Sequence, residues 1–258
     1  MLLTIDIGNT NITFGVYDLN ETTLPLRYHW RIKTDHGRLS DEYGIIMLGM
    51  MRHEKIDYEH IHGVAIASVV PPLTPVFETM VERYIHQTPL VVAAGVKTGI
   101  KIRYDSPRDV GADRIVDAVA AYRLYGGPAC IVDFGTATTF DAISKRGDYL
   151  GGAIAPGIGI AAEALFSQTS KLPRVDLVRP PRAIGRNTVQ AIQSGLLFGY
   201  VGMVEGMVER YKIELGDDLR VIGTGGLAEI VAKETSAIEV VNQWLTLEGL
   251  RMIWEMNQ

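Results

Sequence analysis

Two short segments of the chain place a carboxylate, glycine and hydroxyl residues directly after an apolar run. In the first segment, Asp6, Gly8 and Thr10 follow the run that begins at Leu2, and Thr13 comes three residues later. Backbone N–H groups and hydroxyls around such a turn can hold a polyphosphate, and glycine permits its close approach. Because a lone carboxylate would repel phosphate, Asp6 implies a bridging divalent cation, most reasonably Mg²⁺. The alternative is that Asp6 only caps a β-turn.

A further carboxylate, Asp113, stands at the start of a segment with helical spacing of apolar residues. The segment spans residues 113–125 and is followed by a Gly-Gly-Pro stop. In the first turn of a helix, the dipole and the free N–H groups favour the ionised carboxylate. Such a group can receive the hydroxyl proton in phosphoryl transfer, so Asp113 is predicted to be the general base. The neighbouring Arg114 could bind a substrate carboxylate or form a surface ion pair, and Asp113 could be an ordinary first-turn residue.

The first acidic segment recurs about half a chain later. Residues 3–10, ending in Asp-Ile-Gly-Asn-Thr, are echoed by residues 130–138, in which Asp133 and Gly135 take the places of Asp6 and Gly8. Each copy is followed by a second apolar run, residues 12–17 or 139–143. A unit repeated at this distance predicts two like-folded domains facing each other across a central cleft. We therefore expect a duplicated α/β fold, divided into residues 1–112 and 113–258.

Other segments supply the elements around these turns. Residues 63–70 and 90–94 are typical of buried strands, and the amphipathic residues 76–85 between them complete a β-α-β unit. Residues 188–215 predict a long helix whose glycines, at 195, 199, 202 and 206, favour core or dimer packing. Residues 220–233 indicate a strand, a glycine turn and a helix that could contact a nucleotide.

Composition excludes several classes of protein. The 258 residues carry a formal charge of −5 without long basic runs, which gives no footprint for nucleic acid or an anionic membrane. The one cysteine, Cys130, lies in an apolar run, so neither a disulfide nor a cysteine metal site is expected, and a cytoplasmic setting fits. The start lacks the pattern of a signal peptide, and the longest apolar runs look too short and too interrupted by glycine to span a bilayer.

Two familiar nucleotide motifs are missing or incomplete. The phosphate loop of ordinary P-loop kinases is absent, and Gly223-Thr-Gly-Gly lacks the third glycine of the dinucleotide fingerprint. The histidines at 53, 60 and 62 do not share one helix face, so a solvated segment is favoured over a metal site.

Taken together, seven motifs resemble the type III pantothenate kinases. They are Asp6-Ile-Gly-Asn-Thr-Asn, Ser68-Val-Val-Pro-Pro-Leu-Thr, Gly111-Ala-Asp-Arg, Asp133-Phe-Gly-Thr-Ala-Thr-Thr, Gly151-Gly-Ala-Ile-Ala-Pro-Gly, Gly185-Arg-Asn-Thr and Gly223-Thr-Gly-Gly. They run in order from residue 6 to residue 226, and it is the whole set that is specific.

The resemblance implies two ribonuclease H-like domains of the acetate and sugar kinase/actin-like ATPase superfamily. It also implies a homodimer that transfers the γ-phosphate of ATP to pantothenate, the first step of coenzyme A synthesis. The residues that would bind ATP and Mg²⁺ are Asp6, Ile7, Gly8, Asn9, Thr10, Asn11, Ile12 and Thr13, with Thr136 also touching ATP. Asp113 would be the base, Asp133 would bind a monovalent cation (K⁺ or NH₄⁺), and the pantothenate site would contain Tyr104, Gly111, Ala112, Asp113, Arg114 and Thr188.

Three other functions are compatible with parts of this pattern. A sugar kinase or polyphosphate hydrolase of the same superfamily would share the phosphate turns, but Tyr104 and residues 111–114 argue against it. Some relatives were described as transcriptional activators, but Asp6, Asp113 and Asp133 favour catalysis. A scaffolding role would leave these carboxylates without a purpose.

Overall fold

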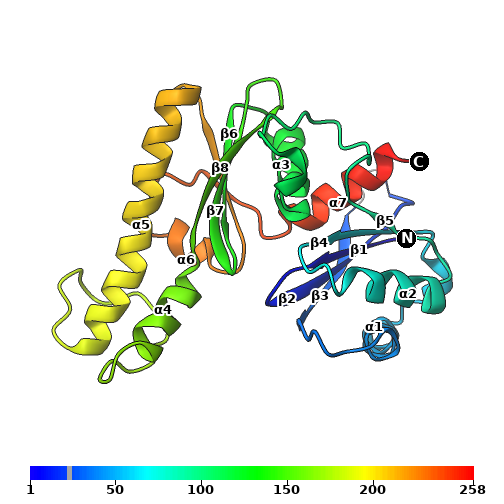
Figure 1. The fold of residues 1–258 in the computed structure, drawn as a ribbon, viewed down its shortest axis with the longest axis horizontal. Helices are drawn as coiled ribbons and strands as arrows, with labels where there is room; N and C mark the ends of the chain where they lie inside the picture. Colours follow the sequence, from blue (N-terminus) through cyan, green and yellow to red (C-terminus); the bar gives the residue numbers. More distant parts are fainter. Residues whose placement is uncertain (22–24) are drawn as a thin grey trace. The chain divides into compact units, whose positions relative to one another are not determined.

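The computed structural model describes residues 1–21 and 25–258, which form two compact units (Figure 1). The first unit contains residues 1–99, 105–120 and 245–258 of the described chain, and the second contains residues 100–104 and 121–244. Helix α3 (Ala112–Tyr125) therefore begins in one unit and ends in the other. Each unit is built around one five-stranded sheet.

The first sheet has the strand order β3-β2-β1-β4-β5. Its strands are β1 (Leu2–Ile7), β2 (Asn11–Tyr17), β3 (Leu26–Lys33), β4 (Gly63–Ser68) and β5 (Leu90–Val91). Strand β1 is parallel to β4 and antiparallel to β2, and β2 is antiparallel to β3. The carboxyl ends of β1 and β4 therefore lie at the same edge of the sheet, where open α/β sheets commonly bind ligands.

The two faces of the first sheet are covered by different helices. Alternate residues of β1, such as Leu3 and Ile5, belong to a core shared with α1 (Ser40–His53) and α2 (Thr74–Tyr84). The other face is covered by the amphipathic helix α7 (Leu245–Met256), which lies on the opposite side of the sheet in Figure 1. On that face, a Cβ atom added at Gly15 would lie 2.9 Å from Cδ1 of Leu247. Side-chain alternation along β1 therefore directs Asp6 toward the α7 face.

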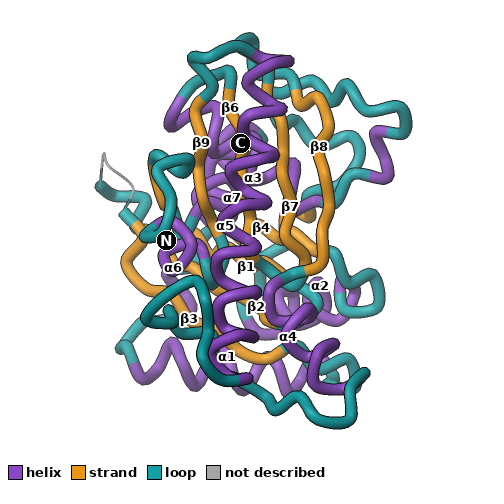
Figure 2. The backbone as a smooth tube through the Cα atoms, turned by 90° about the vertical axis from the view of Figure 1, so that its left-hand side faces the viewer, coloured by secondary structure: helices purple, strands orange, loops and turns teal. Residues whose placement is uncertain are grey.

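The second sheet repeats the same topology, in the order β10-β9-β6-β7-β8. Its strands are β6 (Ala129–Phe134), β7 (Ala137–Ile143), β8 (Tyr149–Pro156), β9 (Arg220–Thr224) and β10 (Val240–Val241). One face packs on α4 (Ile158–Ser167), α5 (Thr188–Leu215) and α6 (Ala228–Ala232). Figure 2 shows α5 running along this sheet. The predicted duplicated α/β fold is thus confirmed, because β6, β7, β8, β9 and β10 correspond in order and direction to β1, β2, β3, β4 and β5.

The compact units differ in extent from the predicted halves. The last helix, α7, returns to the first sheet, and the first turns of α3 also belong to that unit. The division into residues 1–112 and 113–258 concerns the repeated halves of the sequence, and it stays a prediction.

Helix α5 corrects one expectation from the sequence. By length and composition alone, it is the one described helix that could cross a membrane. The expectation counted only uninterrupted apolar runs, whereas α5 is apolar on average across its glycines. In the structure, Leu196, Leu197 and Val204 are buried in the core of the second unit, while Glu205 and Glu209 are exposed. Packing against β6, α4 and α6 accounts for the apolar residues of this helix.

Substitution by alanine is expected to have opposite effects on stability at two helical glycines, Gly249 and Gly49. A Cβ atom at Gly249 of α7 would meet the carbonyl of Val116 and would lie 2.7 Å from its Cγ1, so α3 and α7 are in close contact there. We expect Gly249→Ala to lower the free energy of unfolding by roughly 1–3 kcal/mol through overpacking. Urea unfolding followed by circular dichroism measures the change.

The matched control is Gly49→Ala on α1. A Cβ atom at Gly49 would have no neighbour within 4 Å. Alanine should therefore raise the free energy of unfolding by roughly 0.5–1 kcal/mol through its higher helix propensity. Equal effects of the two substitutions would contradict the described contact between α3 and α7.

Candidate active site

The turn between β1 and β2 is held by hydrogen bonds to its backbone, and its tip is exposed. The N–H of Gly8 donates to the carbonyl of Asn11 at 3.0 Å. The hydroxyl of Thr34 donates to the carbonyl of Gly8 at 2.6 Å, and the N–H of Thr34 donates to the carbonyl of Thr10 at 3.0 Å. Asn9, Thr10 and Asn11 are exposed at the tip. The turn is therefore shaped before any ligand binds and offers its polar groups to solvent.

Thr34 is a positioning residue that the sequence analysis missed. It is 7% exposed and follows the last residue of β3. No local motif marks it, because its role depends on the pairing of β3 with β2. The available signal was the alternation of Tyr28, Trp30 and Ile32 with basic residues just before Thr34, which the sequence analysis did not use.

Asp113 lies at the same edge of the first sheet as this turn. The N–H of Val69, just after β4, donates to the carbonyl of Ile7 at 3.1 Å. A Cβ atom at Gly111 would lie 3.4 Å from Cγ1 of Val69 and 2.5 Å from Oδ1 of Asp113. Glycine at position 111 thus lets the backbone pass close to both β4 and the Asp113 carboxylate. Within the first unit, two segments that are a hundred residues apart in the sequence are therefore brought to one edge.

The pKa of Asp113 is raised, chiefly because burial disfavours its charged form. Its Oδ1 accepts a hydrogen bond from the N–H of Arg114 at 2.8 Å, and this bond and the Arg114 charge both lower the pKa. The expected stabilisation of the ionised form by the helix start therefore exists, but desolvation outweighs it. A carboxylate with a raised pKa is the stronger proton acceptor, which suits a general base.

The second copy of the motif places Asp133 between two glycine turns. Gly225, after β9, has a φ of +87°, and a side chain there would collide with Oδ1 of Asp133 and the backbone of Phe134. The N–H of Gly157 donates to the carbonyl of Thr136 at 3.1 Å. Carboxylate and carbonyl oxygens therefore gather at the end of β6, and oxygen ligands suit a hard cation. The described residues contain no cluster of three or more His, Cys, Asp or Glu side chains fit to hold a metal ion.

Tyr104 and Thr188 lie on separate elements of the second unit. The ring of Tyr104 is 39% exposed, and its centroid is 6.5 Å from that of Tyr149. Thr188 is the first residue of α5, where the Asn187 side chain accepts a hydrogen bond from the N–H of Gln190 at 2.9 Å. The pantothenate pocket predicted from these two residues stays a prediction.

A buried carboxylate in the second sheet also escaped the sequence analysis. Asp141 on β7 is 1% exposed and accepts hydrogen bonds from the hydroxyls of Tyr149 at 2.7 Å and Thr139 at 3.1 Å. The available signal was an acidic residue inside an apolar strand. Because Thr139 is paired with Asp133 across the sheet, Asp141 helps to order the strand beside the second acidic turn.

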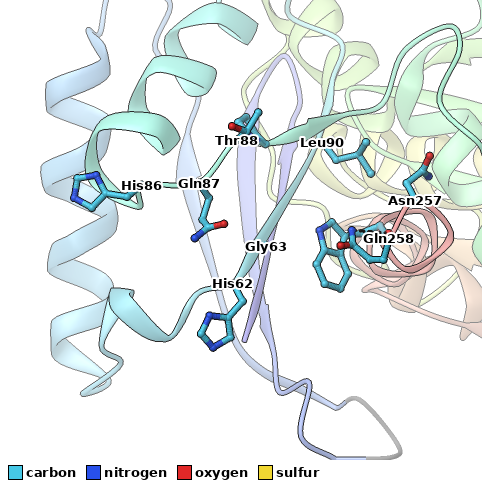
Figure 3. A pocket seen from close by; sticks show the side chains of 10 residues that line it. His62, Gly63, His86, Gln87, Thr88, Leu90, Asn257 and Gln258 are labelled. Atoms are coloured by element: carbon cyan, nitrogen blue, oxygen red, sulfur yellow. Dashed lines mark hydrogen bonds between the residues drawn. The ribbon is translucent and has the colours of Figure 1, made fainter.

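A hollow of about 550 Å³ in the first unit lies at the opposite ends of the strands (Figure 3). It is lined by residues just before and within the starts of β4 and β5, among them His62, His86 and Thr88, and by the end of α7. Neither Asp6 nor Gly111, which lie at the carboxyl-end edge of the sheet, lines this hollow. This hollow is therefore separate from the candidate active site.

Known structures define the fold class. Over 99% of this chain and 98% of the other, the fold resembles that of a Campylobacter jejuni protein described as a candidate Baf family transcriptional activator, with a TM-score of 0.63 and 19% identity. It also resembles the inorganic polyphosphate/ATP-glucomannokinase of an Arthrobacter species, with a TM-score of 0.53 and 12% identity, over 100% of this chain and 99% of the other. The chain thus has the duplicated ribonuclease H-like fold of the sugar kinases and actin-like ATPases.

Sequence comparison identifies the family within this class. A sequence model described as type III pantothenate kinase matches residues 2–210. The chain is 53% identical over 257 residues to a type III pantothenate kinase of Moorella thermoacetica, covering 100% of both chains. It is equally identical to one of Myxococcus xanthus, covering 100% of this chain and 99% of the relative. The chain belongs to the type III pantothenate kinase family, and it is a phosphotransferase enzyme.

Proposed function

We propose that the protein transfers the γ-phosphate of ATP to the hydroxyl of pantothenate and so begins coenzyme A synthesis. The observation that carries this proposal is the position of Asp113, whose carboxylate lies at the same edge of the first sheet as the Asp6 turn. Together they offer a proton acceptor and a phosphate-binding turn within one compact unit. The names of the relatives supply the substrate, and the single buried cysteine fits a cytoplasmic setting.

Residues 6–13 hold the ATP phosphates in this proposal. The backbone N–H groups and hydroxyls of the turn would bind the phosphate oxygens, and the Asp6 carboxylate would hold Mg²⁺, partly through water. When bound, Mg²⁺ neutralises charge on the phosphates. Thr34 keeps the turn in its binding conformation through two hydrogen bonds.

Asp113 receives the proton of the pantothenate hydroxyl as the bond to phosphorus forms. Its raised pKa supports this role, because the ionised carboxylate is more basic than an ordinary aspartate. Gly111 and Ala112 line the pantothenate site beside Asp113, and Arg114 binds the pantothenate carboxylate through its guanidinium. Tyr104 and Thr188 complete the acceptor site in the proposal.

The test of this assignment is Asp113→Asn. Because asparagine cannot accept the proton, turnover should fall by roughly 10² to 10⁴. Binding of MgATP, measured by calorimetry, should survive. In the wild type, kcat/KM should fall with decreasing pH as Asp113 becomes protonated, with an apparent pKa above the usual aspartate value of about 3.9.

Asp109→Asn serves as the matched control. Asp109 is an exposed acidic residue in the short 3₁₀ helix Pro107–Asp109, outside the proposed site. Its substitution should leave turnover within about twofold of wild type, as surface changes usually do. Wild-type turnover in Asp113→Asn would remove Asp113 as the base.

Asp133 is proposed to bind the monovalent cation, K⁺ or NH₄⁺, while Thr136 contacts ATP. The carboxylate and the carbonyl oxygens at this turn support the proposal, since such cations take oxygen ligands. We expect Asp133→Asn to abolish the difference in rate between potassium and sodium buffers. Rates are measured as ADP release at constant ionic strength, and a variant with the wild-type potassium response would contradict the assignment.

A homodimer formed through α5 is also proposed. Gly195, Gly199 and Gly202 are exposed, and added Cβ atoms there would have no neighbour within 4 Å. Ile213, on the same helical stripe, is 86% exposed. Small residues along a stripe allow a second backbone to approach closely.

Gly199→Leu should dissociate this dimer, because the added side chain would occupy the contact between helices. Sedimentation velocity should give the mass of two chains for wild type and of one chain for the variant. Gly49→Leu on α1, which also points into open space, should leave the mass unchanged. A wild-type mass of one chain at micromolar concentration would reject the dimer.

A further inference from the structure

Edge strand β3 carries a row of cationic side chains on one face. Tyr28, Trp30 and Ile32 pack against the core shared with α1 and α2. The alternate residues His29, Arg31 and Lys33 are exposed and point to the other face, whereas Arg27 lies at the bulge where the pairing with β2 shifts. This is the face on which Asp6 lies.

Register across the first sheet aligns three polar side chains in one row. Asp6 of β1 is paired with Thr13 of β2, and Thr13 is paired with Arg31 of β3. Directly opposite side chains lie on the same face, so the carboxylate, the hydroxyl and the guanidinium share it. Two strand spacings place the backbones of Asp6 and Arg31 about 10 Å apart, with Thr13 between them.

This row lies beyond the part of the face that α7 covers. The next row inward contains Thr4, Gly15 and His29, and Leu247 of α7 lies over Gly15. Thr13 and Asp6 are only half-buried, and Arg31 is exposed. A ligand on the turn of residues 8–11 would therefore meet the row of Asp6, Thr13 and Arg31 directly.

The side chain of Arg31 is available to such a ligand. In the described part of the chain it forms no ion pair and no hydrogen bond. Lys33, paired with Asn11 in the row nearest the turn, adds a second positive charge that is likewise not engaged in an ion pair there. Guanidinium groups bind phosphate oxygens bidentately, so the chemistry of this edge fits an anionic phosphate group.

The second sheet offers a natural comparison. In the equivalent row, Asp133 is paired with Thr139, and Thr139 is paired with Ile154 of β8. Ile154 occupies the place of Arg31 and is 66% exposed. An apolar residue thus supports the same strand pairing, so folding of the repeat does not require a cation there. The charge on β3 is specific to the copy that is proposed to hold the triphosphate.

We propose that Arg31 is a further ligand of the ATP phosphates, acting from β3 opposite Asp6 across Thr13. The inference rests on the proposed kinase function and adds a residue outside the 6–13 turn. A triphosphate bound over Thr13 would have the Asp6 carboxylate, which would hold Mg²⁺, on one side and the Arg31 guanidinium on the other. The edge strand is then part of the nucleotide site as well as of the fold.

Calorimetric titration of the full-length protein with MgATP tests this inference without any turnover. Arg31→Gln should weaken MgATP binding roughly tenfold to a hundredfold, the range for loss of a charge-assisted hydrogen bond. Arg31→Lys should recover part of the affinity, because it keeps the charge but loses the planar fork. Steady-state kinetics should show the same rise in KM for ATP and an unchanged KM for pantothenate.

Arg27→Gln is the matched control. Arg27 is exposed at the bulge near the start of the same strand, four residues before Arg31, and it pairs with Glu21. The affinity of the Arg27→Gln variant for MgATP should stay within about twofold of wild type. Circular dichroism and thermal unfolding of each variant confirm that the fold is retained.

The possible outcomes separate this inference from the proposed function. Wild-type MgATP affinity in Arg31→Gln, a rise confined to the KM for pantothenate, or no binding of MgATP by wild type would each overturn the role of Arg31. If wild type binds MgATP, loses affinity in Arg31→Gln and yet does not phosphorylate pantothenate, the role of Arg31 stands. In that case it is the proposed acceptor that fails.

Discussion

Pairing of β1 with the strands on both its sides is the constraint on which the site depends. The carbonyl of Ile7 accepts a hydrogen bond from Val69 beyond β4, and the carbonyls of Gly8 and Thr10 accept from Thr34 beyond β3. These bonds fix a turn that would otherwise have to be ordered by the ligand at an entropic cost. The same bonds bring the ends of β3 and β4 to the turn. Gly111, which lies next to Val69, then places the Asp113 carboxylate at this edge.

Burial is the main influence on the pKa of the Asp113 carboxylate at this edge of the sheet. Desolvation raises the pKa of Asp113, although the adjacent amide and guanidinium act in the opposite direction. Asp6 is paired with Thr13 of β2 and with Ala67 of β4, and it is half-buried on the α7 face of the sheet. The two carboxylates at this edge of the sheet therefore lie in different surroundings, and burial affects their charged forms differently.

The sequence was sufficient to predict the duplicated fold, because each copy has a local signature of an apolar strand, an acidic turn and a second strand. It was also sufficient to predict the α3 and α5 helices. The positions of Thr34, Asp141 and Arg31 beside the acidic turns escaped prediction because they depend on strand register, which no local pattern specifies. The raised pKa of Asp113 was missed for a related reason, since burial by distant segments outweighed the local effect of the helix start. Likewise, α7 joins the first unit through tertiary contacts with β1 and α3 that its position at the end of the chain does not predict.

The two similar acidic turns of the duplicated fold have different surroundings. In the first copy, Arg31 of β3 lies in the row that contains Asp6, whereas in the second copy Ile154 takes the place of the arginine and Gly225 packs closely against Asp133. The most direct test of the central claim is the mass of the product formed from ATP, Mg²⁺ and pantothenate in potassium buffer. We expect pantothenate to gain one phosphoryl group, with one ADP released for each. ADP release that is unchanged when pantothenate is omitted, or a complete absence of release, would contradict it.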